Sequence, residues 1–392
     1  MIEEYNMFIR IISDHLAEKQ TTICDDCDWM KMAYLARIHQ VDGIIYHQCK
    51  DFITSDIKTR FEYAYKATLF FYINRKKAME EIEKAFYEKG ISFFLLKGLE
   101  IAKYYPIPFL RTMGDCDILI QRKDMQCATD TLRKIGYKGS NNIHVEHWAC
   151  DKNGLHFEIH DNVIQEDECT TPSQNQFFND YERYIKDGSL DWGFHFLFLL
   201  MHLRKHLISG GAGIRQFMDL AVIIKKVPNM DWKWIERQTR KLHIDKFANA
   251  CFSLIQNWFN IASPINIQPL DNIVINELTE KILKNGVFGF QDTGNQFNRA
   301  RKMLLVGKSP LWIRRVKKIA RDMFPTYEYM RGYPNCQYLE KASFLLPAAW
   351  IYRWVYILRG KNNIDSIKTV QHSFAENSDL EAQREFLKKI GL

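Results

Sequence analysis

The 392-residue sequence has few of the residues and runs that mark fibrous, disordered or membrane-spanning proteins. It contains only 10 prolines and 19 glycines, which excludes collagen-like and low-complexity chains. Its hydrophobic fraction of 46% and charged fraction of 26% exclude intrinsic disorder for most of the chain. No run of about 18 apolar residues is free of charge, and Arg353 interrupts the nearest one, 342–358. No transmembrane helix is therefore expected.

The sequence also lacks the marks of a secreted protein. Its nine cysteines are odd in number and scattered, which indicates reduced thiols and not a disulfide framework. Glu3 and Glu4 stand where a signal peptide needs positive charge. We therefore expect a cytoplasmic protein.

The net charge of +7 is concentrated in one part of the chain. Residues 297–361 contain 14 lysines and arginines against three acids, a balance of +11, so the remainder carries −4. Such a region can bind nucleic acid, another polyanion or an anionic membrane, or it can be a solvated surface. An aromatic segment at 348–358 can lie peripherally on the inner membrane face, or it can be a helix buried between domains.

Hydrophobic periodicity divides the chain into helical and strand-rich parts. Helices are expected at 29–48 and 58–89, the second ending at Gly90. The strand-rich part that follows should contain helices at 99–105 and 123–135 and strands at 91–96, 115–120, 143–150 and 155–160. Asp151-Lys-Asn-Gly154, between the last two strands, is typical of a hairpin turn.

From Asp191 the pattern is helical again. Helices are expected at 194–208, 215–226, 231–242 and 245–259, at intervals typical of a bundle. The signal weakens after residue 262, with a loop expected at 285–298 and helices resuming near Pro310 and Pro347. The predicted regions are 1–90, helical; 91–165, an α/β core; 190–262, a helical bundle; and 263–392, basic and mainly helical.

Three acids in the strand-rich part are candidate metal ligands. Asp115 and Asp117 are two residues apart in a strand, so their carboxylates should share one face while Cys116 points to the packed side. Two such charges are costly together unless a cation neutralises them. If Glu158 lies on a neighbouring strand, the three acids can hold Mg²⁺, with Mn²⁺ as the alternative, for phosphoryl or nucleotidyl transfer.

Basic residues nearby are candidate phosphate contacts. Lys97-Gly98 follows a strand and precedes a helix-like segment, where a glycine lets a phosphate approach backbone N–H groups. Arg111, four residues before Asp115, can clamp phosphate oxygens. Lys97 and Arg111 are equally compatible with structural ion pairs to the acids.

The ordered motifs resemble a bacterial family of uncharacterised nucleotidyltransferases, within the superfamily that has the DNA polymerase β-like fold. The motifs are Leu96-Lys-Gly98, Arg111-Thr-Met-Gly-Asp-Cys-Asp-Ile-Leu119, Gly136-Tyr137, Phe157-Glu-Ile-His160, His202-Leu-Arg-Lys-His206 and Arg215–Asp219, and the resemblance covers roughly residues 25–260. It implies an α+β fold, with a small mixed β-sheet and flanking helices embedded in a mainly α-helical protein. It also implies catalytic acids at Asp115, Asp117 and Glu158, and substrate contacts at Lys97, Gly98, Arg111, His160 and Arg215.

The resemblance predicts transfer of a nucleoside monophosphate from a nucleoside triphosphate (NTP) by a two-metal mechanism. The acceptor stays open among a small molecule, a sugar, a protein and an RNA. The superfamily usually has Gly-Ser or Gly-Gly in the phosphate turn, whereas Lys97-Gly98-Leu99 has no hydroxyl, so Lys97 is expected to contact phosphate instead. The alternative is a catalytically weak protein on the same fold that binds nucleotide, nucleic acid or another polyanion, the last through residues 297–361.

Two further pairs have the spacing of metal ligands. His202 and His206 are four residues apart on an expected helix, and Cys24 and Cys27 form a single C-x-x-C. The histidine pair has no evident third ligand, and the cysteine pair needs two more, for which the only nearby candidates are His39, His47 and Cys49. We therefore expect the histidines to be buried or to face phosphate, and the cysteines to lie in a loop.

Overall fold

A computed structural model describes residues 2–23, 27–53, 55–139, 147–164, 170–208, 211–287, 336–340, 342–359 and 377–392, with isolated positions between 312 and 330. The chain divides into two compact units. The first comprises Met1–Leu207, Gly211–Gly289 and Lys389–Leu392, and the second comprises Ile208–Gly210 and Phe290–Lys388. Each unit is described by itself.

The first unit contains a mixed five-stranded sheet, as expected of an α+β fold. Its strands are β1 (Phe93–Leu95), β2 (Asp115–Ile120), β3 (Lys138–Gly139), β4 (His147–Lys152) and β5 (Leu155–His160). They lie in the order β1-β2-β5-β4-β3. Strands β2 and β5 are parallel, and every other neighbouring pair is antiparallel. The strands predicted at 91–96, 115–120 and 155–160 are confirmed; residues 140–146 lie outside the described residues.

A two-residue turn sets the register of the β4–β5 hairpin. Asn153 and Gly154 have φ angles of 52° and 73°, both in the left-handed region that this tight turn requires. Lys152 and Leu155 are therefore directly paired, and the pairing continues to His147 opposite His160. Because side chains alternate along a strand, this register decides which residues of both strands share a face.

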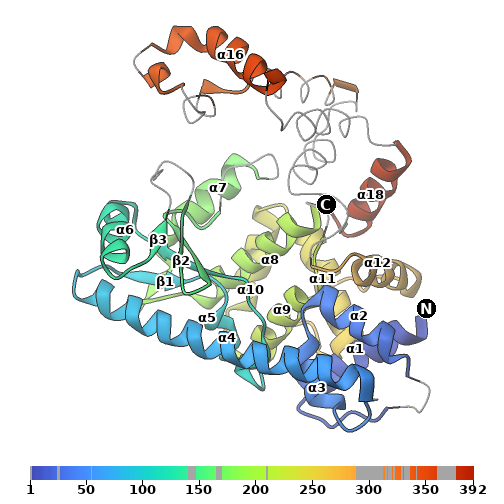
Figure 1. Ribbon diagram of the computed structural model, residues 1–392. Helices are drawn as coiled ribbons and strands as arrows, with labels where there is room; N and C mark the ends of the chain where they lie inside the picture. The colour runs from blue at the N-terminus through green and yellow to red at the C-terminus, as the bar shows by residue number, and fades with distance from the viewer. Residues whose placement is uncertain are drawn as a thin grey trace. The chain divides into compact units, whose positions relative to one another are not determined.

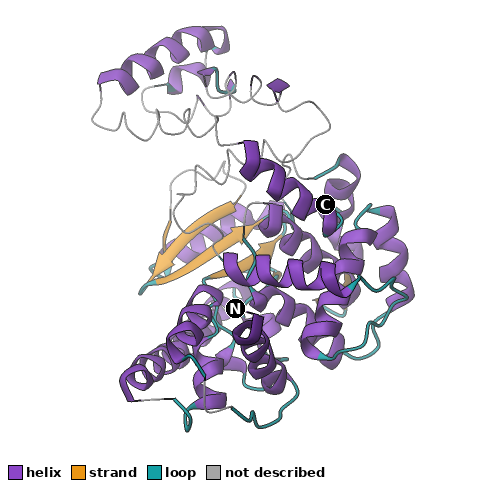
Figure 2. Cartoon of the chain, turned by 90° about the vertical axis from the view of Figure 1, so that its right-hand side faces the viewer, coloured by secondary structure: helices purple, strands orange, loops and turns teal. Residues whose placement is uncertain are grey.

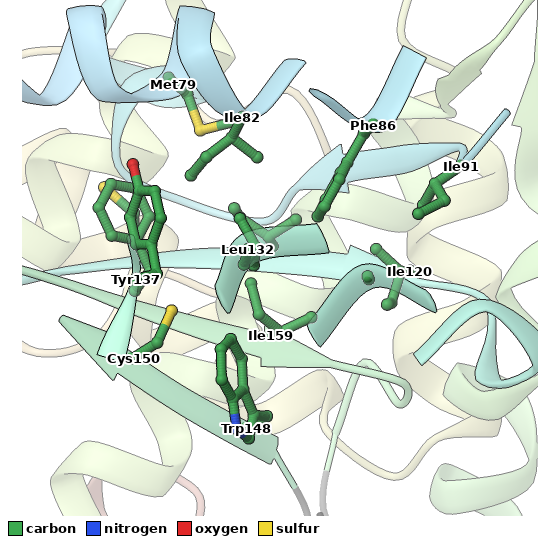
Figure 3. Packing of buried hydrophobic residues seen from close by; sticks show 14 of the residues in the cluster. Met79, Ile82, Phe86, Ile91, Ile120, Leu132, Tyr137, Trp148, Cys150 and Ile159 are labelled. Atoms are coloured by element: carbon green, nitrogen blue, oxygen red, sulfur yellow. The ribbon is translucent and has the colours of Figure 1, made fainter. Parts of the chain in front are cut away.

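One face of the sheet is apolar and packs on two helices, α4 (Ser55–Tyr87) and α6 (Met125–Lys134). Figure 3 shows Met79, Ile82 and Phe86 of α4 and Leu132 of α6 against residues of the sheet. The strand residues in this core alternate along the sequence and are almost completely buried; they are Cys116, Ile118, Ile120, Trp148, Cys150, Leu155, Phe157 and Ile159. Burial of each large apolar side chain stabilises the fold by about 1.5–3 kcal/mol.

Helices make up most of the remainder of the first unit (Figures 1 and 2). Those before the sheet are α1 (Ile2–Leu16), α2 (Trp29–His39) and α3 (Asp42–Cys49). The short α5 (Leu99–Ala102) follows β1, and a small hairpin, β6 (Ile185–Lys186) and β7 (Ser189–Leu190), precedes α8. The later helices are α7 (Pro172–Asn179), α8 (Trp192–Ile208), α9 (Ile214–Lys226), α10 (Trp232–Lys241), α11 (Asp245–Phe259) and α12 (Asn272–Asn285). The helices expected between 194 and 259 are confirmed, whereas α7 and α12 were not predicted.

The second unit is described in part. Its helix α16 (Leu346–Arg359) packs Ala349 and Trp350 into a small core with Met330, Cys336 and Leu339. Helix α18 (Asn377–Lys389) lies further along the chain. Residues 288–311 and 360–376 lie outside the described residues, including most of the predicted loop at 285–298.

Two predictions made from composition agree with the described residues. Among the described cysteines, six carry free thiols: Cys49, Cys116, Cys127, Cys150, Cys251 and Cys336. None of the helices that can be described combines the length and apolarity needed to cross a membrane.

Candidate active site

The second face of the sheet carries polar side chains on three neighbouring strands, β2, β5 and β4. Strands β2 and β5 place Asp115 beside His156 and Asp117 beside Glu158. On the other side of β5, His147 of β4 lies opposite His160. The expectation that Glu158 lies on a strand next to the two aspartates is therefore confirmed, and Cys116 points into the apolar core as predicted.

Asp117 is buried and lies between the ammonium of Lys97 and the imidazole of His160. One of its oxygens is 3.0 Å from Nζ of Lys97, and the other is 3.3 Å from Nε2 of His160. Burial acts to raise the pKa of Asp117, but Lys97 and His160 outweigh it and hold this pKa well below its usual range. The carboxylate is therefore ionised, and its charge is neutralised from within the protein.

The other two acids have different surroundings. Asp115 is exposed at the start of β2. Glu158 is partly buried, with Oε2 lying 3.2 Å from Nε2 of His160 and Oε1 lying 3.8 Å from Nε2 of both His147 and His156. The contact with His160 lowers the pKa of Glu158, against the opposing effect of burial. Strand pairing thus brings the three predicted acids to one face.

Lys97 is held after β1 by a backbone turn and by two partly buried histidines. Gly98 follows it with a φ of 63° and a ψ of −117°, a conformation that side chains disfavour. The helix after this turn, α5, has only four residues. Nζ of Lys97 also lies 3.4 Å from Nε2 of His202, which is 2.9 Å from Nε2 of His206.

These contacts fix the protonation of the two histidines. An ammonium can only donate, so Nε2 of His202 must accept from Lys97, and the contact with Nε2 of His206 then requires that His206 donate. Burial lowers the pKa of His206 to about 3 and the pKa of His202 well below its usual value. Both rings are neutral, and both histidines are partly buried, so the expectation that they are buried is met only in part.

Arg111 has a different partner from those that the sequence suggested. Its Nε and Nη2 donate to the two oxygens of Asp219 at 2.7 Å each, and Tyr105 donates to the same carboxylate at 2.7 Å. Side-chain exposure is 5% for Arg111 and 9% for Asp219. The guanidinium that was expected to clamp phosphate, or to pair with the strand acids, is instead engaged in a buried bidentate ion pair with α9.

Arg215 and Arg75 hold the loop between Arg111 and Asp115. Arg215 was predicted to contact substrate, but its Nη1 donates to the carbonyl of Thr112 at 2.6 Å. Arg75, which the sequence did not single out, donates to the carbonyl of Gly114 at 2.6 Å. The three arginines therefore fix the backbone that leads into Asp115. No pattern in the sequence identifies such contacts, because their acceptors are backbone oxygens far away in the chain.

The match to a family model agrees with this arrangement. Residues 25–260, more than half of the chain, match the family described as uncharacterised nucleotidyltransferase. The chain belongs to this family. No curated protein and no solved structure matches it. The matched range contains the whole five-stranded sheet, Lys97 and helices α8 and α9, which supply the residues that support the polar face.

Family membership supports nucleotidyl transfer as the general activity. A hollow of about 700 Å³, lined by Tyr87 of α4 and Phe93 of β1 among others, lies elsewhere. Neither Asp117 nor Glu158 lines this hollow. The polar face is therefore the better candidate for the active site.

Proposed function

We propose that the protein transfers a nucleoside monophosphate from an NTP to an acceptor hydroxyl or amine at the polar face of its sheet. The observation that carries this proposal is the direct pairing of Asp117 with Glu158, with exposed Asp115 two residues earlier on the same face. Membership of the nucleotidyltransferase family supports the same reaction.

The donor set fits Mg²⁺, because hard divalent cations prefer carboxylate oxygens and often join them to substrate phosphates. Asp115, Asp117 and Glu158 would hold the ions, and Mn²⁺ is the natural substitute. Bound metal would neutralise the triphosphate and stabilise charge that develops in the transition state. Lys97 already supplies positive charge to Asp117, so the face tolerates this acid before any cation arrives.

The chain's own basic groups suit the triphosphate. Lys97 is 18% exposed and is oriented by the neutral His202, so its ammonium can turn from Asp117 to a phosphate oxygen. Glu158 is ionised and 22% exposed, so it can accept the proton of an attacking hydroxyl or amine. Arg111 and Arg215 act behind this face by fixing the loop into Asp115. The acceptor can be a small molecule, a sugar, a protein side chain or an RNA end, the four classes left open by the sequence.

Calorimetric titration tests the proposal. ATP, GTP, CTP and UTP are each added with Mg²⁺ to the wild-type chain and to the double variant Asp115→Ala/Asp117→Ala. We expect metal-dependent binding of at least one NTP, lost in the double variant and retained in Asp130→Ala, which removes an exposed carboxylate from α6. Absence of binding by every NTP to folded wild-type protein would contradict the proposal.

A second candidate function is binding without turnover. The turn Lys97-Gly98-Leu99 has no hydroxyl, and residues 297–361 carry a balance of +11, which suits a nucleic acid or another polyanion. Polyanion binding through this region predicts a steep loss of affinity with added salt, no pyrophosphate release, and no effect of Asp115→Ala/Asp117→Ala. Release of pyrophosphate by wild type alone would exclude this candidate.

A further inference from the structure

Three side chains on the polar face form a mixed nitrogen and oxygen cluster. His147, Glu158 and His160 each offer one potential ligand atom, and these atoms all lie within 4.8 Å of one another. The two imidazole rings are 5.3 Å apart between centroids, because their residues are directly opposed in the antiparallel β4–β5 pair. Glu158 precedes His160 by two residues and shares its face.

The separations match those of ligands around a small metal ion. Two ligands bound at about 2.0–2.1 Å in tetrahedral geometry lie about 3.3 Å apart. In the structure, Oε2 of Glu158 lies 3.2 Å from Nε2 of His160, and Oε1 lies 3.8 Å from Nε2 of His147. One ligand atom from each of the three residues lies within 4.8 Å of the others, so side-chain rotations would be needed to bring all three to one ion. Three protein ligands leave a further position open for water or substrate.

His160 provides a second, independent observation. Its Nε2 is buried and makes no hydrogen bond of good geometry, although it lies between a carboxylate oxygen of Asp117 and one of Glu158. A buried polar atom without a hydrogen bond is uncommon and calls for a partner. A metal ion on this nitrogen would satisfy it and would also neutralise the carboxylate beside it.

A neighbouring histidine lies beside the same carboxylate without belonging to the cluster. His156 donates from Nδ1 to Asp151 at 2.8 Å and turns its Nε2 to within 3.8 Å of Glu158. This hydrogen bond holds the ring to Asp151 and not to a residue of the cluster. His156 is 40% exposed, however, and lies outside the three-residue cluster.

We propose that His147, Glu158 and His160 bind one divalent first-row transition-metal ion, such as Zn²⁺ or Co²⁺, in preference to Mg²⁺. Imidazole nitrogen suits zinc, copper, iron and nickel, whereas Mg²⁺ is bound mainly by oxygen. The site shares Glu158 with the proposed Mg²⁺ ligands, but it depends on neither nucleotide binding nor transfer. It would place a Lewis acid beside Asp117, at the edge of the face where an acceptor group can bind.

Cobalt absorption and zinc calorimetry test the proposal on the full-length chain, stripped of metal with a chelator. We expect one Co²⁺ per chain with visible bands of low-symmetry nitrogen and oxygen coordination, and no thiolate-to-cobalt charge-transfer band. That band would assign the metal to cysteines, such as Cys24 and Cys27, and would overturn the proposal. A tenfold excess of Zn²⁺ should remove the bands, and millimolar Mg²⁺ should leave them; displacement by Mg²⁺ would also overturn it.

Four variants locate the ligands. Changes behind a metal ligand already cost about 10–100-fold in affinity, so His147→Ala and His160→Ala should each weaken Zn²⁺ binding by more than that. His147→Gln keeps the size and polarity of the side chain and should weaken binding equally. His156→Gln is the matched control, since it removes an imidazole beside the same carboxylate and should change the affinity by less than tenfold.

The outcomes separate this inference from the proposed function. Wild-type affinity in His147→Gln, or a loss in His156→Gln as large as in His147→Gln, would refute the assigned ligands. Raising of the melting temperature by Zn²⁺ in wild type, but not in His147→Gln, would support them without any assay of transfer. Cobalt binding without NTP binding would support the metal site and refute the proposed reaction. NTP binding without cobalt binding would refute the metal site and leave the proposed reaction unaffected.

Discussion

The buried ion pair between Arg111 and Asp219 gives the sharpest test of how the site is built. Asp219→Ala removes the carboxylate that receives two hydrogen bonds from Arg111 and one from Tyr105, each 2.7 Å long. With 5% of the Arg111 side chain exposed, water cannot replace the lost partner. The variant therefore leaves a buried positive charge without a counter-ion.

The expected loss is large for one substitution. Breaking a buried ion pair by removing one partner costs about 3–5 kcal/mol. Replacing both partners by apolar groups, as in Arg111→Met/Asp219→Leu, should cost less than either single change, because no buried charge is left. Tyr105→Phe removes one hydrogen bond to a charged group and should cost about 1.5–3 kcal/mol.

Equilibrium urea unfolding measures these differences. Each free energy of unfolding comes from linear extrapolation, and an unchanged m value shows that the same surface is exposed. Asp130→Ala is the control, because it removes an exposed Asp–Arg pair with Arg133 and should cost under about 1 kcal/mol. A loss of less than about 1 kcal/mol in the free energy of unfolding of Asp219→Ala, at unchanged m, would refute this reasoning. Arg111 would then again be a candidate contact for substrate phosphate.

Three further predictions concern the same sheet. Burial lowers the pKa of His160, but Asp117 and Glu158 raise it more, so its pKa is higher in the folded than in the unfolded chain. The resulting contribution to the free energy of unfolding is complete below about pH 6.5, the unfolded pKa, and is lost as pH rises through the folded pKa. The free energy of unfolding of His160→Gln, measured against pH, should not show this loss. A pH dependence identical to that of wild type would contradict the prediction. Gly139→Ala drives a Cβ into the ring of Trp148 and to 2.8 Å from the carbonyl of Ala149, so it should lower the free energy of unfolding by about 1–3 kcal/mol. Gly114→Ala meets nothing within 4 Å and is its control; equal effects on thermal unfolding would refute the clash. Lys97→Met should weaken NTP binding by roughly 10–100-fold in calorimetry, the value of one charged hydrogen bond, and unchanged affinity would place Lys97 off the triphosphate.

Local patterns were sufficient to predict the strands that form the polar face. The alternation in 115–120 and 155–160 placed the acids on one side and the apolar residues on the other, as the structure confirms. Asn153-Gly154 predicted the hairpin because its two left-handed residues are a local requirement. Helix α12 was not predicted, because it lies after residue 262, where the hydrophobic periodicity of the sequence is weak.

Contacts between distant segments could not be predicted in the same way. Arg111 and Asp219 are 108 residues apart, and nothing near Arg111 in the sequence distinguishes an ion-pair partner from a phosphate ligand. The carbonyl contacts of Arg75 and Arg215 involve acceptors that every residue carries. The roles of Asp115, Asp117 and Glu158 in metal binding and catalysis stay predictions, as do the boundaries of the four regions.

His147 is the residue that sequence reasoning had the means to find. A two-residue turn at Asn153-Gly154 pairs Lys152 with Leu155, and counting back from this pair places His147 opposite His160. The turn residues that predict the hairpin therefore also predict that these two histidines lie side by side.

The charges on the polar face explain why one surface can serve both proposals. Asp115, Asp117 and Glu158 supply three carboxylates, Lys97 contacts one oxygen of Asp117, and the imidazole of His160 lies between the other oxygen and Glu158. A transition metal on His147, Glu158 and His160 would require an unprotonated Nε2 on His160, while Mg²⁺ and a triphosphate would draw Lys97 away from Asp117. The two events act on opposite sides of Asp117, because Lys97 contacts one of its oxygens and His160 the other. Asp117 is therefore the residue through which metal binding on one side would alter nucleotide binding on the other.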